Sequence, residues 1–195
     1  MNMKKLLGLM LALFGMEFAL ALEQPEYVVV AEYDEWEVRH YKPYIAAMTR
    51  VTGSFEKVGN QAFKRLGGYI FGDNARDEKI AMTAPVAQGR SSETGDYWVT
   101  FMMPSEYDMA ALPDPADGRV EMVQVPARHL AVVKYRGGWS QKKYRQHEQR
   151  LRDALAAQAD WQIAGEAVWA RYNPPFVPPF FRHNEVMIPV TRVQP

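Results

Sequence analysis

The chain has no cysteine among its 195 residues. That absence excludes disulfide bonds, thiolate metal sites, attachment of a cofactor through a C-x-x-C-H motif and a bacterial lipoprotein anchor. A protein without these links depends on its hydrophobic core for stability. The composition, with 48% hydrophobic and 12% aromatic residues, is sufficient to build such a core.

A net charge is also missing, because 23 basic residues balance 23 acidic ones. Removing residues 1–21, which contain Lys4, Lys5 and Glu17, leaves 23 − 2 = 21 basic and 23 − 1 = 22 acidic residues, a net charge of −1. Proteins that bind DNA or RNA usually carry a basic excess. We therefore expect no nucleic-acid partner.

Familiar catalytic motifs are absent as well. The sequence has no G-x-S-x-G elbow, H-E-x-x-H helix, glycine-rich phosphate loop or G-x-G-x-x-G fingerprint. Its four histidines, at positions 40, 129, 147 and 183, lack the close spacing of zinc ligands. The sequence therefore gives little support to an enzyme.

Long hydrophobic runs are missing except at the start of the chain. Lys4 and Lys5 precede an apolar run over residues 6–16, and a small-residue Ala-Leu-Ala pattern follows at 19–21. This arrangement predicts a signal peptide over residues 1–21, cut after Ala21, and a periplasmic or secreted protein. An uncleaved anchor is the alternative, although the run is shorter than the roughly 20 residues that a spanning helix needs. Residues 22–195 are predicted to form a single domain.

Two parts of this domain share one pattern, in which a strand leads through a glycine-containing turn into an amphipathic helix. The first has a strand at 44–51 and a helix from 55 to about 70, and the second has a strand at 129–136 and a helix from 141 to about 159. Ser54 and Ser140 precede the helices as predicted N-caps. This self-similarity predicts an internally duplicated fold.

Most of the remaining segments are rich in β-forming residues. Two helices with about nine strands indicate an α+β fold. Polar stretches at 73–78, 88–96 and 105–119 are predicted as loops. The predicted strands cover residues 27–32, 36–41, 44–51, 79–86, 97–103, 120–125, 130–136, 168–172 and 185–190.

Three stretches together resemble the SOUL haem-binding family: EVRHY at 37–41, KIAMTAPV at 79–86, and YNPP at 172–175 with FRHNEV at 181–186. The resemblance implies a distorted antiparallel β-barrel of two related halves with two flanking helices, an architecture shared with GyrI-like effector-binding domains. It also implies binding of haem or another tetrapyrrole, which must be non-covalent without cysteine. From its residues, the 79–86 segment is interpreted as scaffold, with Pro85 ending a barrel strand.

His40 is the main candidate for contact with haem iron. Strand alternation puts Trp36, Val38 and His40 on one face, and Arg39 and Tyr41 on the other. A neutral imidazole in an apolar setting suits an axial iron ligand, while a half-buried structural histidine is the alternative. The resemblance supports His40 as an iron ligand, because this residue matches a histidine proposed as an axial ligand in some SOUL members. Other members are thought to bind haem through an apolar surface alone.

Haem propionates favour basic side chains at the rim of a site. The candidates are Lys64, Arg65, Arg39 and Arg182, with solvated surface charge as the alternative for each. The resemblance favours Lys64, because family models place a basic face of the first helix near the ligand. Methionines on predicted strands are candidates for an adaptable apolar lining, with core packing as the alternative; they are Met48, Met82, Met102 and Met103.

The segment at 176–181 is apolar and stiffened by prolines, from Phe176 to Phe181. It is interpreted as a lid over a ligand, a transient membrane contact or a structural strap. Two other functions stay open. One is a GyrI-like module for amphipathic compounds, which would need a buried acid such as Glu166 in its pocket. The other is a tetrapyrrole-modifying or ester-hydrolysing enzyme, which would need a polar group of perturbed pKa there.

Overall fold

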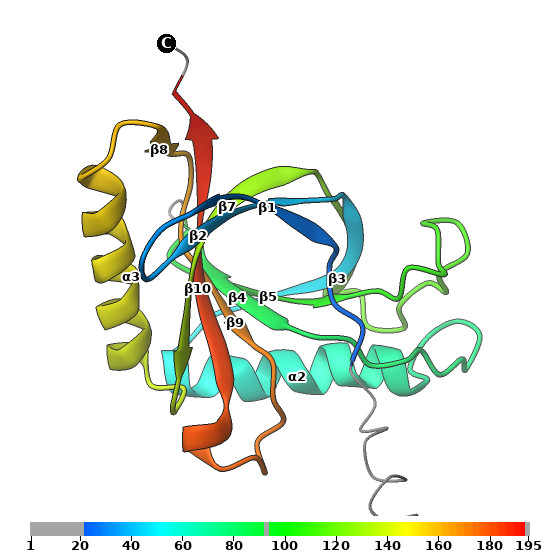
Figure 1. The fold of residues 1–195 in the computed structure, drawn as a ribbon. Helices are drawn as coiled ribbons and strands as arrows, with labels where there is room; N and C mark the ends of the chain where they lie inside the picture. Colours follow the sequence, from blue (N-terminus) through cyan, green and yellow to red (C-terminus); the bar gives the residue numbers. More distant parts are fainter. Residues whose placement is uncertain (1–21, 92–93, 194–195) are drawn as a thin grey trace, which may run out of the picture.

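The structure, a computed structural model, describes residues 22–91 and 94–193. The predicted signal peptide over 1–21 lies outside these residues. Helix α2 (Phe55–Phe71) and helix α3 (Gln141–Ala156) pack on the outside of one curled antiparallel sheet, which confirms the α+β prediction (Figure 1). The strands are β1 (Tyr27–Glu32), β2 (Glu37–Tyr41), β3 (Tyr44–Val51), β4 (Val86–Arg90), β5 (Tyr97–Met102), β6 (Val120–Val125), β7 (Arg128–Arg136), β8 (Trp161–Ile163), β9 (Val168–Arg171) and β10 (His183–Arg192).

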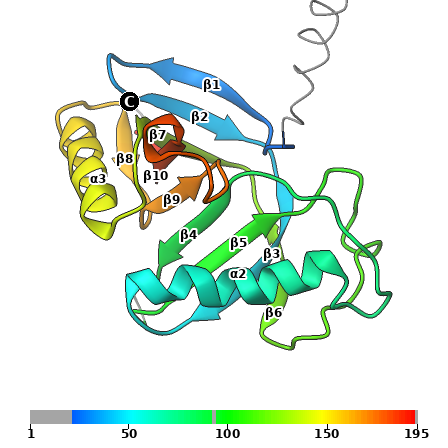
Figure 2. The ribbon, with the colours of Figure 1, turned by 90° about the horizontal axis from the view of Figure 1, so that it is seen from below.

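The strand order reveals the internal duplication. The main path of the sheet is β1-β2-β7-β10-β9-β4-β5-β3-β6, and β8 pairs with β10 beside it. Around the β4–β9 pair, β5 mirrors β10, β3 mirrors β7 and β6 mirrors β2. Along the chain, β2-β3-α2-β4-β5 therefore matches β6-β7-α3-β9-β10, and α2 and α3 occupy matching places (Figure 2).

Two short connections force this sheet to curl. Strands β2 and β3 lie near opposite ends of the path, yet only Lys42 and Pro43 join them. Three Cα–Cα steps of about 3.8 Å cover at most about 11 Å. Pro126 and Ala127 impose the same limit between β6 and β7. The two ends of the sheet must therefore approach each other, which gives the half-barrel in Figure 1.

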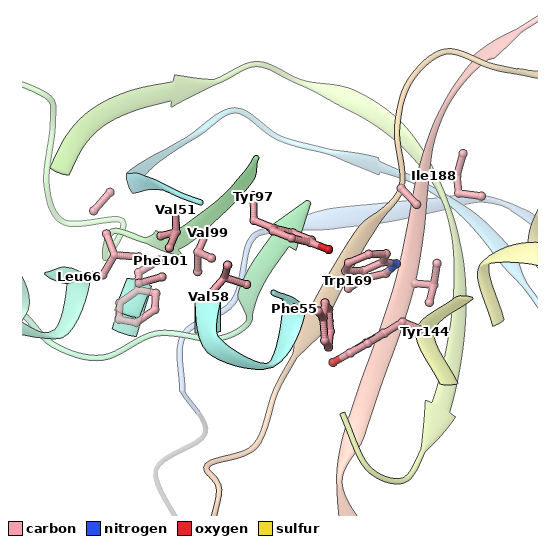
Figure 3. Close-up of a cluster of buried hydrophobic side chains, with 14 of the residues drawn as sticks. Val51, Phe55, Val58, Leu66, Tyr97, Val99, Phe101, Tyr144, Trp169 and Ile188 are labelled. Atoms are coloured by element: carbon pink, nitrogen blue, oxygen red, sulfur yellow. The ribbon is translucent and has the colours of Figure 1, made fainter. Parts of the chain in front are cut away.

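A large hydrophobic core fills the space between the helices and the convex face of the sheet. Helix α2 contributes Val58, Ala62 and Leu66 to it, all fully buried. The two halves meet where Phe55 packs edge-on against Trp169 and Tyr144 (Figure 3). A second, smaller cluster lies on the concave face of the sheet. Successive residues along a strand therefore pack alternately into the core beneath the helices and into the cluster on the concave face.

The prediction of a strand at 79–86 is wrong. Residues 79–85 form an irregular connection, in which the Ala84 amide donates to the Glu23 carbonyl, and Val86 begins β4. Pro85 has no amide hydrogen, so regular pairing begins only after it, in β4. That strand takes up part of the predicted loop at 88–96.

Two smaller predictions also differ from the structure. Strand β8 is absent from the predictions because three residues are too few to show a periodic pattern. Ser54 occupies the N-cap position of α2 without a side-chain capping bond. Ser140, in contrast, accepts from the Lys143 amide and confirms the predicted cap of α3.

Candidate functional site

The concave face of the sheet holds a cavity of about 250 Å³. Its walls come from strands of both halves and are mainly aromatic and aliphatic; they include Tyr41, Met48, Trp98, Leu130, Val168 and Met187. Tyr44 and Pro126, in or beside the two short connections, also line it. The cavity therefore lies where the two ends of the sheet approach each other.

A glycine fixes one wall of this cavity. Gly89 on β4 pairs with Trp98 on β5, and a Cβ atom at position 89 would lie 2.1 Å from Cζ2 of the indole. No real Cβ contact is that short, so the ring lies over Gly89 only because this residue has no side chain. Close approach of the backbone thus places a large apolar surface against the cavity.

A buried ion pair lies beside the cavity on the same face. Arg39 donates from Nη1 and Nη2 to the two carboxylate oxygens of Glu185, at 3.0 and 2.9 Å, and both side chains are 1% exposed. Arg39 also donates to the Tyr41 hydroxyl at 2.7 Å, and the Tyr172 hydroxyl donates to Glu185 at 2.6 Å. Both tyrosines line the cavity, so this network supports its walls.

The network determines the charge state of its members. Burial favours a raised pKa for Glu185, but hydrogen bonds from His183 and Arg39 and the charge of Arg39 outweigh it and lower the pKa to about 2. Burial and the charge of Glu185 raise the pKa of the Tyr172 hydroxyl. Glu185 is therefore a carboxylate neutralised by Arg39, and Arg39 has no free charge for a ligand at a rim.

His40 lies on the convex face, opposite the cavity. Val38 is fully buried in the core beneath the helices and Trp36 packs against that core, whereas Tyr41 lines the cavity. The predicted alternation along β2 is thus confirmed. His40 itself is exposed, and its ring stacks on His129 of β7 with centroids 4.6 Å apart.

The two imidazoles lie in a row of paired residues that crosses five strands. Val28 pairs with His40, His40 with His129, His129 with Val190, and Val190 with Ile163. Directly paired residues share one face of an antiparallel sheet. Val28 and Ile163, at the two ends of the row, are 56% and 37% exposed, whereas Val190 between His129 and Ile163 is 3% exposed.

An indole and a basic residue complete this surface. The ring of Trp161 lies 5.3 Å from that of His129, and Arg192 pairs with Trp161 across β8 and β10. Burial, followed by the charges of His40 and Arg192, lowers the pKa of His129. A neutral imidazole has one unprotonated ring nitrogen, which can coordinate a metal ion. We call the surface formed by Val28, His40, His129, Trp161, Ile163 and Arg192 the His40 face.

The other predicted site residues are dispersed. Lys64 lines a polar groove beside α2, and Arg65 beside it donates to the Arg50 carbonyl. Met82 is 48% exposed in the connection before β4. Arg182 donates to the Val177 carbonyl near the short helix η1 (Pro179–Phe181). The structure therefore does not bring these four side chains together with His40.

Other candidates from the sequence fall into different environments. Met48 and Met102 line the cavity, whereas Met103 belongs to the core under the helices. Glu166 is 58% exposed and faces Arg152, so it is not the buried acid that a GyrI-like pocket would need. Phe176, 85% exposed, belongs to the apolar segment at 176–181.

Sequence reasoning missed His129 and Arg128 as site residues. His129 faces His40 only through the β2–β7 pairing, which joins residues 89 positions apart. Arg128 lines the cavity because it pairs with Tyr41 in the same ladder. The sequence did place His129 on a strand, because the repeated strand–helix pattern predicts that β7 matches β3. Its partner strand was not predictable from local residues.

Comparison with known proteins finds relatives over most of the chain. Residues 22–189 match the family model described as SOUL heme-binding protein. Heme-binding protein 2 of Homo sapiens is 30% identical over 161 residues, which cover 78% of this chain and 77% of that protein. Heme-binding protein 2 of Mus musculus is 29% identical over 180 residues, covering 86% of each.

Solved structures share the fold at low identity. The C-terminal domain of EcmrR is similar with a TM-score of 0.61 at 12% identity, over 86% of this chain and 99% of that chain. A hydrolase from Listeria innocua is similar with a TM-score of 0.52 at 12% identity, over 91% and 97%. At such identities the similarity concerns the architecture alone.

Proposed function

This chain belongs to the SOUL haem-binding protein family, and we propose that it holds haem, or a related tetrapyrrole, non-covalently on the His40 face. The observation that carries the proposal is the exposed imidazole of His40 stacked on His129. Haem, when bound, would supply an iron centre that an imidazole nitrogen can hold. His40 is the residue that we assign to this role.

The donor set of the His40 face suits the ligand. Val28 and Ile163 offer exposed apolar surface, and the largely buried indole of Trp161, 8% exposed, packs beside His129. Arg192 supplies a cation on the same face, and a guanidinium forms strong charge-assisted hydrogen bonds with carboxylates such as propionates. Arg192 rather than Lys64, Arg65 or Arg182 is therefore the basic partner that we assign.

The cavity is a poorer match for the macrocycle. Its volume of about 250 Å³ is below the roughly 300–1,000 Å³ of typical small-molecule pockets. No histidine is among its lining residues. Size and donor chemistry both favour the open convex face for haem.

A hemin titration of residues 22–195 tests this function. We expect a Soret shift that saturates near one equivalent. Arg192→Gln should weaken hemin binding, whereas Arg136→Gln, at the opposite end of the sheet on β7, should not. A response that never saturates, or one that both variants leave unchanged, would contradict binding on the His40 face.

Buffering or transport of haem outside the cytoplasm is the role that best fits a binding protein with a signal peptide. The basic start, apolar run and Ala-Leu-Ala pattern of residues 1–21 support export. Among the described residues, no helix is long and apolar enough to span a membrane. Expression in a bacterial host with cell fractionation tests the role, since the exported protein should lack residues 1–21 by mass spectrometry. A full-length product in the cytoplasm would refute export.

The segment at 176–181 supports a further part of the proposal, transient contact with a membrane surface. Phe176, Phe180 and Phe181 are 85%, 66% and 61% exposed. Exposed aromatic groups of this kind are typical of interaction sites. Contact with lipid would place the protein where a hydrophobic ligand is delivered or released.

The GyrI-like alternative, a module for cationic amphipathic compounds, has little support from the cavity. A cationic amphipathic compound would need a free carboxylate in the pocket, and Glu185 is already neutralised by Arg39. The enzymatic alternative has less support, since the family is named for binding and the Listeria innocua hydrolase shares only the fold. Turnover of haem with a reductant would be the observation in its favour.

A further inference from the structure

One charged side chain faces the cavity, that of Arg128 at the start of β7. It pairs with Tyr41 of β2, and the other lining residues carry no acidic or basic group. The lining is otherwise aromatic, aliphatic or neutral polar; its neutral polar residues are Gln124, Thr100 and the three tyrosines Tyr41, Tyr44 and Tyr172. The cavity therefore combines an apolar wall with a single positive charge.

The guanidinium of Arg128 is incompletely satisfied. Its Nε atom is buried and has no hydrogen-bond partner among residues 22–91 and 94–193. None of the ion pairs formed by the described residues includes Arg128. An unpaired buried donor costs free energy, and a charged one costs more. A carboxylate from outside the chain would satisfy this group through a bidentate pair.

The buried acid beside the cavity does not serve Arg128. Both carboxylate oxygens of Glu185 accept from Arg39, and Tyr172 and His183 hydrogen-bond to the same group. The carboxylate is fixed on Arg39, and its charge is balanced there. The positive charge of Arg128 thus remains available to a ligand.

We propose that the cavity is a second ligand site, separate from the haem face, and that it binds a small apolar monocarboxylate through Arg128. A volume of about 250 Å³ equals the share of about eight water molecules at roughly 30 Å³ each. That space suits an acid of about eight to ten non-hydrogen atoms, such as octanoate. The hydrocarbon part contacts side chains such as Met187 and Trp98, and the carboxylate pairs with the guanidinium.

The two sites lie on opposite faces of β2. Tyr41 lines the cavity, while its neighbour His40 points to the convex face. Binding of an acid in the cavity therefore does not occupy the haem face. The two sites are expected to fill independently.

Calorimetry with three eight-carbon probes tests the proposal on residues 22–195. Octanoate should bind with 1:1 stoichiometry and at least about tenfold more tightly than 1-octanol, and octylamine should bind least. Because the probes differ mainly in the headgroup, this series needs no variant. Equal affinity of octanoate and octanol would overturn the role of the charge.

Variants locate the site. Arg128→Gln should weaken octanoate binding about tenfold or more while leaving octanol binding nearly unchanged. Arg136→Gln, at the far end of the same strand, is the matched control. Thermal unfolding should show that both variants are folded; if Arg128→Gln is not, Arg128→Lys should retain part of the preference for octanoate over octanol. Unchanged octanoate affinity in a folded Arg128→Gln variant would refute the assignment.

The effect of hemin on octanoate binding distinguishes this proposal from that of haem binding on the His40 face. His40→Ala should bind octanoate as the wild type does, and saturating hemin should not displace octanoate. Displacement in equal amounts would show that both ligands use one site and would overturn the claim of a separate site. Failure of hemin binding with normal octanoate binding would contradict only the haem proposal.

Discussion

Substitution of Glu185 by Gln tests the central role of the buried ion pair in the fold. The variant removes the fully buried negative charge and leaves the guanidinium of Arg39, 1% exposed, with the partly exposed Glu37 as its remaining counter-ion. Removing one partner of a buried pair typically costs about 3–5 kcal/mol. Lowering the pKa of Glu185 from 4.5 to about 2 corresponds to about 3 kcal/mol at 1.36 kcal/mol per unit. The two routes agree on the magnitude.

The pH dependence gives this prediction its sign. Because folding lowers the pKa of Glu185, its stabilisation is fully present above the unfolded value near 4.5 and is lost as the pH falls towards 2. Urea unfolding should therefore show wild-type stability falling between pH 5 and pH 2.5 by about 2 kcal/mol more than that of Glu185→Gln. Glu121→Gln, on an exposed strand position, is the control. Identical pH slopes in the wild type and Glu185→Gln would refute the reasoning.

Three other outcomes are expected. Gly89→Ala should lower the free energy of unfolding by about 1–3 kcal/mol and change Trp98 fluorescence, because the new Cβ overlaps the indole. Gly118→Ala is the control, since open space surrounds Gly118, and it should change neither quantity. A Gly89→Ala variant with unchanged stability and fluorescence would show that the ring is free to move. Phe176→Ser with Phe180→Ser should reduce co-sedimentation with lipid vesicles at unchanged stability, and equal sedimentation would contradict membrane contact. Octanoate should raise the unfolding temperature of the wild type more than octanol does, as differential scanning fluorimetry would show, and equal shifts would argue against Arg128 as the anion partner.

Local sequence signals predicted the helices and most strands well. The apolar spacing in residues 55–71 places Val58, Ala62 and Leu66 on one stripe, and all three are buried against the sheet. Alternation in β2 gave the correct faces for Val38 and His40. Such patterns are readable because each follows from the period of a single element.

Long-range pairing limited what the sequence predicted. Arg39 was predicted at the rim of a ligand site. In the structure it is buried in an ion pair with Glu185, which lies 146 residues away in the sequence. Strand β4 was predicted mainly as a loop, because Gly89 and its polar neighbours hide the alternation. Gly89 is there to accommodate Trp98, a residue of the next strand. These features depend on contacts between strands, which no local pattern contains.

The most direct test of the account is the absorption spectrum of the hemin complex of His40→Ala. The wild type should show the bands of a histidine-ligated haem. His40→Ala should lose them and bind hemin about tenfold or more weakly, equivalent to about 1.4 kcal/mol, and added imidazole should restore the bands. His147→Ala is the control and should leave the spectrum unchanged. His147 stacks on Tyr135, which lies six residues after His129 on β7. An unaltered spectrum and affinity in His40→Ala would contradict haem binding through this residue.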